Sequence, residues 1–330
     1  MEEFNLAISA SKTYAPYAKV MLSSFYKTHP NSKVNLYLFY LDPTIKNLES
    51  DFIKISKAHN RLNVVDFVKV NKSQIESVDN KKGWAIDLWC RWYLLDYLVD
   101  KCDRVLVLGI DTMLQGNISN FYFQNLKSYY FSCSPDMMIN NSEPTQWPGI
   151  KTEMEKRGFK DKSKYINGDV VLVNLHETRN NLSLGDFLTL YSQNQFICWD
   201  QDVITYCFND KIKFQDYLLY NYFPNLGINT INDYKLYKNA KIIHFAGGPK
   251  PWLVPICEAN KYNAISDWWV YAESMGLTKS FPYLRCYLLA PFRKLKKHIK
   301  NSFIGLILLK ILNYFFLIHG TSPLKLNQLV

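Results

Sequence analysis

Short apolar runs alternate with longer amphipathic segments along most of this chain, and this alternation predicts its fold. Short runs rich in β-branched and aromatic side chains predict strands. These runs cover residues 4–9, 33–41, 61–68, 104–110, 129–134, 165–175 and 241–244. Helices are expected over residues 15–26, 84–98 and 182–192, and from Pro43 and Trp199 onward. Alternating strands and helices indicate a doubly wound, Rossmann-like α/β fold, with a mostly parallel sheet and helices on both faces.

The run from Arg104 to Ile110 is followed at once by Asp111. A short run with so few polar positions is typical of an inner strand of a parallel sheet, buried on both faces. Chemistry in such sheets lies at the carboxyl ends of the strands. Asp111 is therefore a candidate ligand for a metal or a nucleotide; the alternative is that it only caps the next turn.

Other polar side chains stand at the ends of predicted strands. Asp136 follows the run 129–134, and Asn167 and Asp169 flank Gly168 where the run 165–175 begins. Two further carboxylates, in Trp199-Asp-Gln-Asp202, open a helix. N-capping would explain one of them, but two carboxylates and an amide exceed what a cap requires.

The segment 84–98 carries an aromatic stripe that is typical of a core helix, with Arg91 in its middle. An Arg there can reach a phosphate or carboxylate near Asp111, or form a surface salt bridge. His244 ends the last predicted strand and precedes Gly247, Gly248 and Lys250. Glycines let the backbone approach a ligand and Lys suits phosphate, although a lone His after a strand is commonly a buried structural residue. The polar segment 143–163 predicts a loop over the site.

The charge is unevenly distributed. The chain has 39 Lys and Arg against 29 Asp and Glu, a net charge of +10. Residues 277–330 hold nine of the cationic side chains and no acidic ones, so residues 1–276 carry only about +1. This distribution argues against a nucleic-acid groove and for an anionic lipid surface that the tail meets.

The seven cysteines show no C-x-x-C spacing, which predicts free thiols in a reducing compartment. The N-terminal stretch has no basic segment followed by an apolar one, so we expect synthesis in the cytosol without a secretory signal.

In this order, the pieces resemble the family 8 retaining glycosyltransferases, of the galactosyltransferase type that builds bacterial lipopolysaccharide and capsule. The resemblance spans about residues 5–252. It rests on Arg91 before the central strand, the D-x-D position at 109–111, the N-x-G position at 167–169, the D-Q-D segment 200–202 and the H-x-x-G-x-x-K-P-W segment 244–252.

The resemblance implies a GT-A fold, a UDP-sugar donor and a divalent cation, Mn²⁺ or Mg²⁺. It implies metal ligation by Asp111 and His244. Nucleotide contacts are implied for Ala7, Ser9, Tyr14, Ile110, Gly247 and Lys250. Sugar contacts are implied for Arg91, Asp136, Asn167, Asp169 and Asp200. Gln201 or Asp200 would face the sugar opposite the acceptor during a same-face transfer, with a covalent intermediate on Asp200 as a second possibility.

Three positions depart from the family pattern. Gly109 stands where the first D-x-D carboxylate is expected, and Asp169 stands where the family has a glycine. The segment from Ser9 to Lys12 replaces the acidic and amide residues usual in the nucleotide loop. These departures leave an alternative function, a catalytically impaired member that acts at the membrane as a glycan-binding or scaffold protein.

The tail predicts a membrane module. Basic residues crowd positions 293–300 beside apolar residues at helical spacing, and the run 302–318 is almost wholly apolar. A spanning helix needs about 20 apolar residues, so an amphipathic helix lying in the interface is favoured over a span; the alternative is a helix packed on its own domain. We therefore expect a catalytic domain over residues 1–276 and a tail over 277–330, peripheral on the cytoplasmic face of a bacterial membrane, near a lipid-linked oligosaccharide acceptor.

Overall fold

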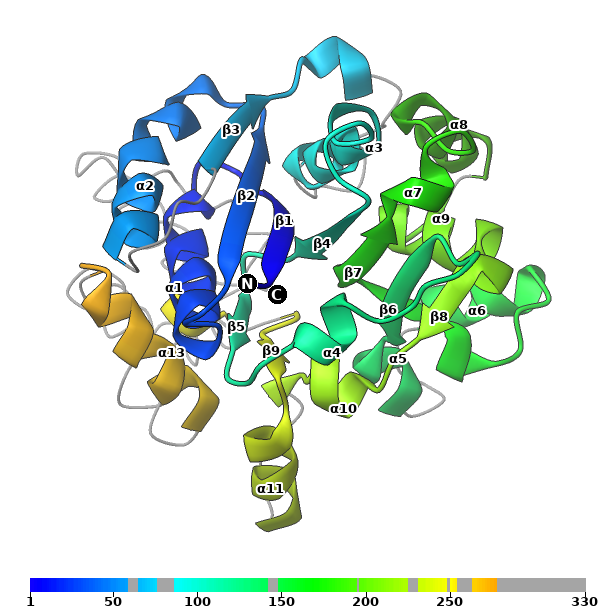
Figure 1. The fold of residues 1–330 in the computed structure, drawn as a ribbon. Coiled ribbons are helices and arrows are strands. Elements are labelled where there is room, and N and C mark those ends of the chain that lie inside the picture. The colour runs from blue at the N-terminus through cyan, green and yellow to red at the C-terminus, as the bar shows by residue number, and fades with distance from the viewer. Residues whose placement is uncertain are drawn as a thin grey trace, which may run out of the picture.

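The protein is described by a computed structural model, which places residues 1–58, 65–75, 86–141, 148–194, 196–224, 231–247, 250–253 and 263–277. A seven-stranded sheet in the order β3-β2-β1-β4-β7-β6-β8 forms its centre (Figure 1). Its strands are β1 (Glu3–Ser9), β2 (Lys33–Tyr40), β3 (Val65–Lys69), β4 (Arg104–Leu108), β6 (Phe131–Pro135), β7 (Ile166–Asn174) and β8 (Ile212–Phe214). A small second sheet pairs β5 (Thr112–Leu114) with β9 (Ile242–His244).

One strand of the large sheet runs against the others. The pairs β1–β2, β2–β3, β1–β4 and β6–β8 are parallel, whereas β7 is antiparallel to both β4 and β6. The first residues of β7 therefore meet the last residues of β1, β4 and β6 at one edge of the sheet. The expected mixed, mostly parallel sheet is confirmed, and its antiparallel strand brings Asn167 and Asp169 to the same edge as Asp111.

Helices cover both faces of the sheet (Figure 1). One face carries α1 (Ala18–Thr28), α2 (Glu49–Ala58) and the short α4 (Ser119–Tyr122). The other carries α3 (Leu94–Tyr97), α7 (Leu175–Thr178), α8 (Leu184–Asn194) and α9 (Trp199–Cys207). In β4, Val105 and Val107 pack on one side while Leu106 and Leu108 pack on the other. Burial on both faces explains why this strand has a continuous apolar run instead of an alternating pattern.

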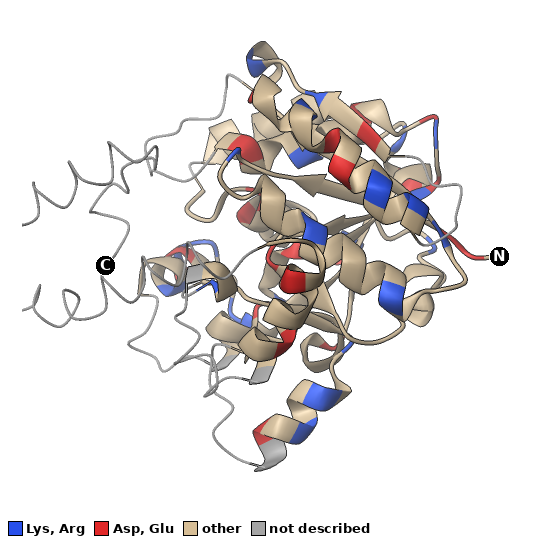
Figure 2. Ribbon diagram, turned by 90° about the vertical axis from the view of Figure 1, so that its left-hand side faces the viewer, with Lys and Arg blue, Asp and Glu red and all other residues tan. Residues whose placement is uncertain are grey.

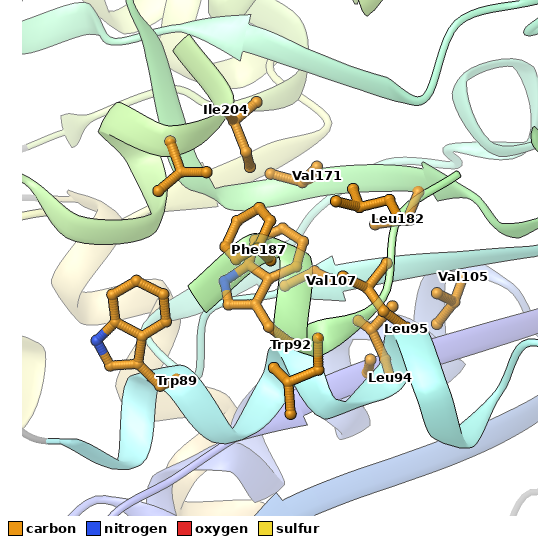
Figure 3. Close-up of a cluster of buried hydrophobic side chains, with 14 of the residues drawn as sticks. Trp89, Trp92, Leu94, Leu95, Val105, Val107, Val171, Leu182, Phe187 and Ile204 are labelled. Atoms are coloured by element: carbon orange, nitrogen blue, oxygen red, sulfur yellow. The ribbon is translucent and has the colours of Figure 1, made fainter. Parts of the chain in front are cut away.

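The core under α8 is built around aromatic rings (Figure 3). Trp92 stacks on Phe187 with ring centroids 4.5 Å apart, and both lie against valines of β4 and β7. Ring pairs in this geometry contribute about 0.5–1.5 kcal/mol beyond the area they bury. The predicted core role of the aromatic stripe is confirmed for Trp89 and Trp92, which are 3% and 0% exposed; Trp84 lies outside the described residues.

The second sheet lies on a separate cluster of aromatic residues. Helix α13 (Asn263–Ser274), which packs beside α1, contributes Trp268 and Trp269. Trp252 lies against them, and its ring stacks on Tyr17 with centroids 4.3 Å apart. This cluster fixes β9 and the chain that follows it, which carry His244 and Lys250. The other α-helices in the described ranges are α5 (Met137–Asn141), α6 (Pro148–Lys156), α10 (Tyr217–Tyr220) and α11 (Ile231–Asn239).

Two sequence predictions need correction. The predicted helix over 84–98 is mainly a 3₁₀ helix, Ile86–Tyr93, which becomes α-helical only in α3. The polar segment 143–163 was expected to be a loop, but its described part contains α6 and a 3₁₀ turn, Lys162–Lys164. Met154 of α6 is 3% exposed and packs with Ile139 and Tyr165. Its few apolar positions are enough to dock a short helix, which the overall polarity of the segment concealed.

Acidic and basic positions are mixed along the same helices of the described chain (Figure 2), in keeping with the nearly neutral balance of residues 1–276. No helix within the described ranges is long and apolar enough to cross a bilayer. The basic and apolar tail from residue 278 onward lies outside those ranges, so the division into a catalytic domain and a membrane tail stays a prediction.

Candidate active site

Asp111, Asp169 and His244 meet at the edge of the sheet where β4 ends and β7 begins. One ligand atom of each lies within 4.8 Å of the others, and Asp111 and His244 are buried. Asp111 follows β4, and Asp169 is near the start of β7. His244 is the last residue of β9, where it pairs with Thr112. Residues far apart in the sequence thus form one polar cluster.

The ring of His244 is held in one orientation. Asn221 donates from Nδ2 to Asn167 Oδ1, so its own Oδ1 is free to accept from His244 Nδ1, at 2.9 Å. This leaves Nε2 as the lone-pair nitrogen. Nε2 is buried, lies 3.5 Å from Asp111 Oδ1 and 3.5 Å from Asp169 Oδ2, and forms no hydrogen bond with any described residue.

Three acceptors therefore face one another, an arrangement that is unfavourable unless a cation or a proton lies between them. Two carboxylate oxygens and one imidazole nitrogen suit Mn²⁺, and Mg²⁺ less well because it prefers oxygen ligands. The donor set fits a divalent cation.

Lys250 approaches the same carboxylate from the other side. Its ammonium bonds to Asp111 Oδ2 and donates to the carbonyl oxygen of Phe245 at 2.8 Å. Burial alone would raise the pKa of Asp111, but the ammonium of Lys250 beside it acts in the opposite direction, and that pKa lies well below its usual range. Asp111 is thus ionised at neutral pH, as a metal ligand must be.

Arg91 lies beneath the cluster and joins two carboxylates. It is 3% exposed, donates from Nη1 to Asp169 at 2.5 Å, and binds Asp200 through Nε at 3.1 Å and Nη2 at 2.5 Å. Trp92 Nε1 also donates to Asp200, at 2.7 Å. The prediction that Arg91 reaches a carboxylate near the strand end is confirmed, and the alternative of a surface salt bridge is wrong.

A second chain of hydrogen bonds continues across the edge. Asn167 donates to Asp136 Oδ2 at 3.0 Å, and the other oxygen of Asp136 accepts from the backbone N–H groups at the start of α5. Gln201 accepts from the N–H of Gly168 at 3.1 Å and directs its amide nitrogen to Asp136, at 3.5 Å. Burial raises the pKa of Asp136. Polar side chains from β6, β7 and α9 thus form one connected network.

The two carboxylates of the D-Q-D segment have different surroundings. Asp200 belongs to the Arg91 network, whereas Asp202 accepts from the N–H groups of Ile197 and Cys198 and from the hydroxyl of Tyr165. Neither is an N-cap, because Cys198 holds that position without a side-chain cap. Asp202 is nevertheless a local structural residue, which ties the turn before α9 to the helix, whereas Asp200 is not.

Apart from Lys250, the residues expected to contact a nucleotide lie in different settings. Ala7 is fully buried in the core and Ile110 is half-buried against it, so their side chains are taken up by packing. Ser9 ends β1, and its hydroxyl is buried without a hydrogen bond to a described residue. Tyr14 is 38% exposed, with its ring 5.7 Å from that of Trp252. Gly247 has φ +69°, a conformation that favours glycine.

Sequence reasoning missed two residues of the site, Asn221 and the indole N–H of Trp92. Asn221 is 0% exposed and orients His244. It stands between two tyrosines with no motif around it, so the sequence offers no signal for its role. Trp92 was assigned only to the core; its position next to Arg91 was the available signal.

Comparisons with known proteins agree on one family. The model of glycosyl transferase family 8 matches residues 5–254. The lipopolysaccharide 1,3-galactosyltransferase of Salmonella typhimurium is 23% identical over 315 residues, 91% of this chain and 87% of that protein. The lipopolysaccharide glucosyltransferase WaaO of Escherichia coli is 23% identical over 192 residues, 56% of this chain and 54% of that protein.

The fold is also similar to that of solved glycosyltransferases. The crystal structure of galactosyltransferase LgtC, in complex with donor and acceptor sugar analogs, superposes with a TM-score of 0.62 and 18% identity. It covers 85% of this chain and 98% of that one. This likeness confirms the GT-A fold.

Proposed function

The chain belongs to glycosyl transferase family 8, and on that premise we propose that it moves a hexose, galactose or glucose, from a UDP-sugar to a lipid-linked bacterial surface glycan with retention of configuration. The observation that carries the proposal is the group of Asp111, Asp169 and His244, with a buried imidazole nitrogen that has no hydrogen bond to a described residue, beside the cation of Lys250. The acceptor class follows from the two relatives named above, both lipopolysaccharide glycosyltransferases.

The metal ligands in this proposal are Asp111 and His244, with Asn221 holding the imidazole in its ligating tautomer. A bound Mn²⁺ or Mg²⁺ supplies positive charge for the diphosphate of the donor. The side chains around the proposed metal position carry an excess of acidic groups, which suits a bound cation. Four carboxyl groups, those of Asp111, Asp136, Asp169 and Asp200, lie at the site with only two cations, Arg91 and Lys250.

Lys250 and Gly247 form the diphosphate side of the proposed site. Lys250 would exchange part of its contact with Asp111 for a phosphate oxygen and so stabilise the negative charge of the leaving UDP. The positive φ of Gly247 is a left-handed backbone conformation that residues with a Cβ atom rarely adopt, and it directs the backbone toward the proposed diphosphate position. The acceptor hydroxyl attacks from the same face and gives its proton to the departing phosphate oxygen.

The sugar side is formed by Gln201, Asp136 and Asn167. We place the amide of Gln201 opposite the leaving group, where it stabilises the oxocarbenium-like transition state. Asp200 is a poorer nucleophile, because Arg91 and Trp92 donate to one of its oxygens and the N–H of Gln201 donates to the other, at 2.9 Å. In this proposal Asp200 orients Arg91 beneath the sugar instead of forming a covalent intermediate.

The tail completes the proposal. Its basic and apolar residues would hold the enzyme on the cytoplasmic face of the membrane beside a lipid-linked acceptor. Sedimentation of the full chain with anionic vesicles, but not with neutral ones, tests this point. Binding that salt does not weaken, or equal binding to both kinds of vesicle, would contradict it.

The decisive experiment incubates the full chain with a panel of UDP-hexoses and Mn²⁺ and measures UDP release. We expect slow hydrolysis of one donor, faster release with rough lipopolysaccharide, and loss of both in Asp111→Asn. Asp210→Asn is the matched control, because Asp210 is exposed. UDP binding without turnover of any donor would favour the alternative of a glycan-binding or scaffold protein, and no UDP binding at all would refute the proposal.

A further inference from the structure

We infer that Asp169 is a metal ligand that takes the place of the carboxylate missing at position 109. The inference rests on the proposed function, because it concerns the same cation. It gives Asp169 a role other than the sugar contact that family resemblance implies for this position.

Position 169 is the cross-strand neighbour of position 109. Strands β4 and β7 pair antiparallel with Leu108 opposite Val170, so the next step along the ladder sets Gly109 opposite Asp169. The N–H of Gly109 donates to the carbonyl oxygen of Asp169 at 2.7 Å, which confirms this pairing. Side chains at directly opposed positions lie on the same face of a sheet, with Cβ atoms about 4.5–5.5 Å apart. A carboxylate moved from 109 to 169 therefore stays within reach of the same point.

The space that a side chain at 109 would occupy is already taken. A Cβ built on Gly109 would lie 2.8 Å from Asp111 Oδ1 and 3.1 Å from Asp169 Cβ. It would also lie 3.3 Å from the carboxyl carbon of Asp169. Aspartate at both positions would crowd the cluster, and without the Asp169 side chain only the contact with Asp111 Oδ1 would remain. Gly109 and Asp169 thus form a matched pair, and neither is an isolated departure from the family pattern.

The two oxygens of Asp169 have separate partners. Oδ1 accepts from Arg91, while Oδ2 faces Nε2 of His244 at 3.5 Å. The Asp169 side chain is 31% exposed, and Asp111 on the opposite side is 13% exposed. The buried, unpaired Nε2 of His244 is the independent sign that this group of acceptors awaits a cation.

Arg91 then links the metal to the sugar side of the site. It holds Asp169 Oδ1 with one arm of its guanidinium and Asp200 with the other. A cation on Asp169 Oδ2 would share that carboxylate with Arg91 and so act on the position of Asp200. In this view Arg91 is a positioning residue: its hydrogen bond orients the ligating carboxylate of Asp169 and tunes the basicity of that carboxylate.

Mn²⁺ binding in the presence of UDP tests the inference without any measurement of turnover. Titration of the full chain, followed by the electron paramagnetic resonance signal of free Mn²⁺, compares Asp169→Asn with the native chain and with the exposed control Asp210→Asn. Asparagine keeps an acceptor for Arg91 but removes the charge. Losing an outer partner already costs about 10–100-fold in metal affinity, so we expect Asp169→Asn to weaken Mn²⁺ binding at least about tenfold and Asp210→Asn to leave it unchanged.

Exchanging the residues at positions 109 and 169 provides a second test, which looks for recovery of Mn²⁺ binding and not only for its loss. Asp169→Gly alone should weaken Mn²⁺ binding, and Gly109→Asp combined with Asp169→Gly should restore most of it. The crowding at 3.1 Å and 3.3 Å disappears in the exchange, and the remaining contact, at 2.8 Å, is with Asp111 Oδ1, the end of a side chain that can turn. Thermal unfolding confirms that each variant is folded.

The results separate the two proposals. If the native chain binds Mn²⁺ and Asp169→Asn binds it equally well, the inference about Asp169 is wrong and the proposed function stands. If the exchange fails to restore binding that Asp169→Gly has lost in a folded protein, Asp169 acts through Arg91 and is not a ligand. If the native chain binds no UDP and releases UDP from no donor, the proposed function itself fails.

Discussion

Replacing Arg91 with methionine tests whether the buried charges at the sheet edge act as one unit. Methionine keeps most of the length of the side chain and removes five N–H donors. The change leaves Asp200, which is 7% exposed, without its cation, and removes the partner of Asp169 Oδ1. A buried carboxylate without a counter-charge is among the most costly groups in a folded protein.

The structure sets the size of the effect. Removing one partner of a buried ion pair costs about 3–5 kcal/mol. Asp200 keeps the indole N–H of Trp92 at 2.7 Å and the backbone N–H of Gln201 at 2.9 Å, and Asp169 is 31% exposed to solvent. These contacts place Arg91→Met at the lower end, about 3 kcal/mol. In that background Asp200→Asn removes the unpaired charge and should return about 2 kcal/mol, the coupling expected between contacting residues.

Urea unfolding followed by tryptophan fluorescence measures both quantities, because several of the eight tryptophans are buried in the folded chain. The matched control is Arg179→Met, whose guanidinium is 35% exposed and lies 3.6 Å from Asp103. Exposed pairs of this kind contribute about 1 kcal/mol or less. If Arg91→Met cost no more than this control, or if the effects of Arg91→Met and Asp200→Asn simply added, the reasoning would be refuted.

Three further predictions address other parts of the molecule. Burial lowers the pKa of His29 from its ordinary 6.5, so below that pH the unfolded chain takes up a proton more readily than the folded chain. The free energy of unfolding should therefore fall as the pH drops below 6.5, by up to about 1.4 kcal/mol per pH unit. Urea unfolding of His29→Gln at several pH values should show a shallower dependence on pH. Gly247→Ala should weaken UDP binding in calorimetry about 5–30-fold, because the left-handed backbone costs about 1–2 kcal/mol, while Gly149→Ala, with open space around it, should not. Asp202→Asn should lose about 1.5–3 kcal/mol of stability in urea, since an amide nitrogen cannot accept the bonds from Ile197 or Tyr165, yet a folded sample should bind Mn²⁺ normally.

Much of the sheet follows from apolar patterning alone. The run at 104–110 predicts β4 because a strand buried on both faces has no polar positions to interrupt it, and Asp111 is conspicuous where that run ends. The pattern of β7 is equally apolar and predicts the strand, but not its direction. A strand that packs on both faces has the same pattern whichever way it runs, so the sequence alone did not place Asp169 opposite Gly109.

The side-chain network was less accessible to prediction. Arg91 could have faced solvent or a carboxylate, because the helix that carries it allows both and only tertiary packing decides. Asn221 lies on an irregular segment beside β9, and its role depends on contacts with His244 and Asn167 that are distant in sequence. Family resemblance supplied the candidate roles. The structure brings the proposed metal and sugar residues into contact, but not the proposed nucleotide residues Ser9 and Tyr14.

The antiparallel register of β4 and β7 has a consequence for how such chains are classified and how they diverge. A search that scores the three-residue D-x-D pattern would count this chain as damaged, although its carboxylate would only have moved to the neighbouring strand, 60 positions later in the sequence. A search that also accepts a carboxylate at the facing position of the neighbouring strand would count the site as intact. The move also constrains ancestry. If glycine at 109 came before aspartate at 169, the intermediate chain had glycine at both positions and a weakened cation site. If aspartate at 169 came first, the intermediate had aspartate at both positions and a crowded site. In either order, the second substitution compensates for the first.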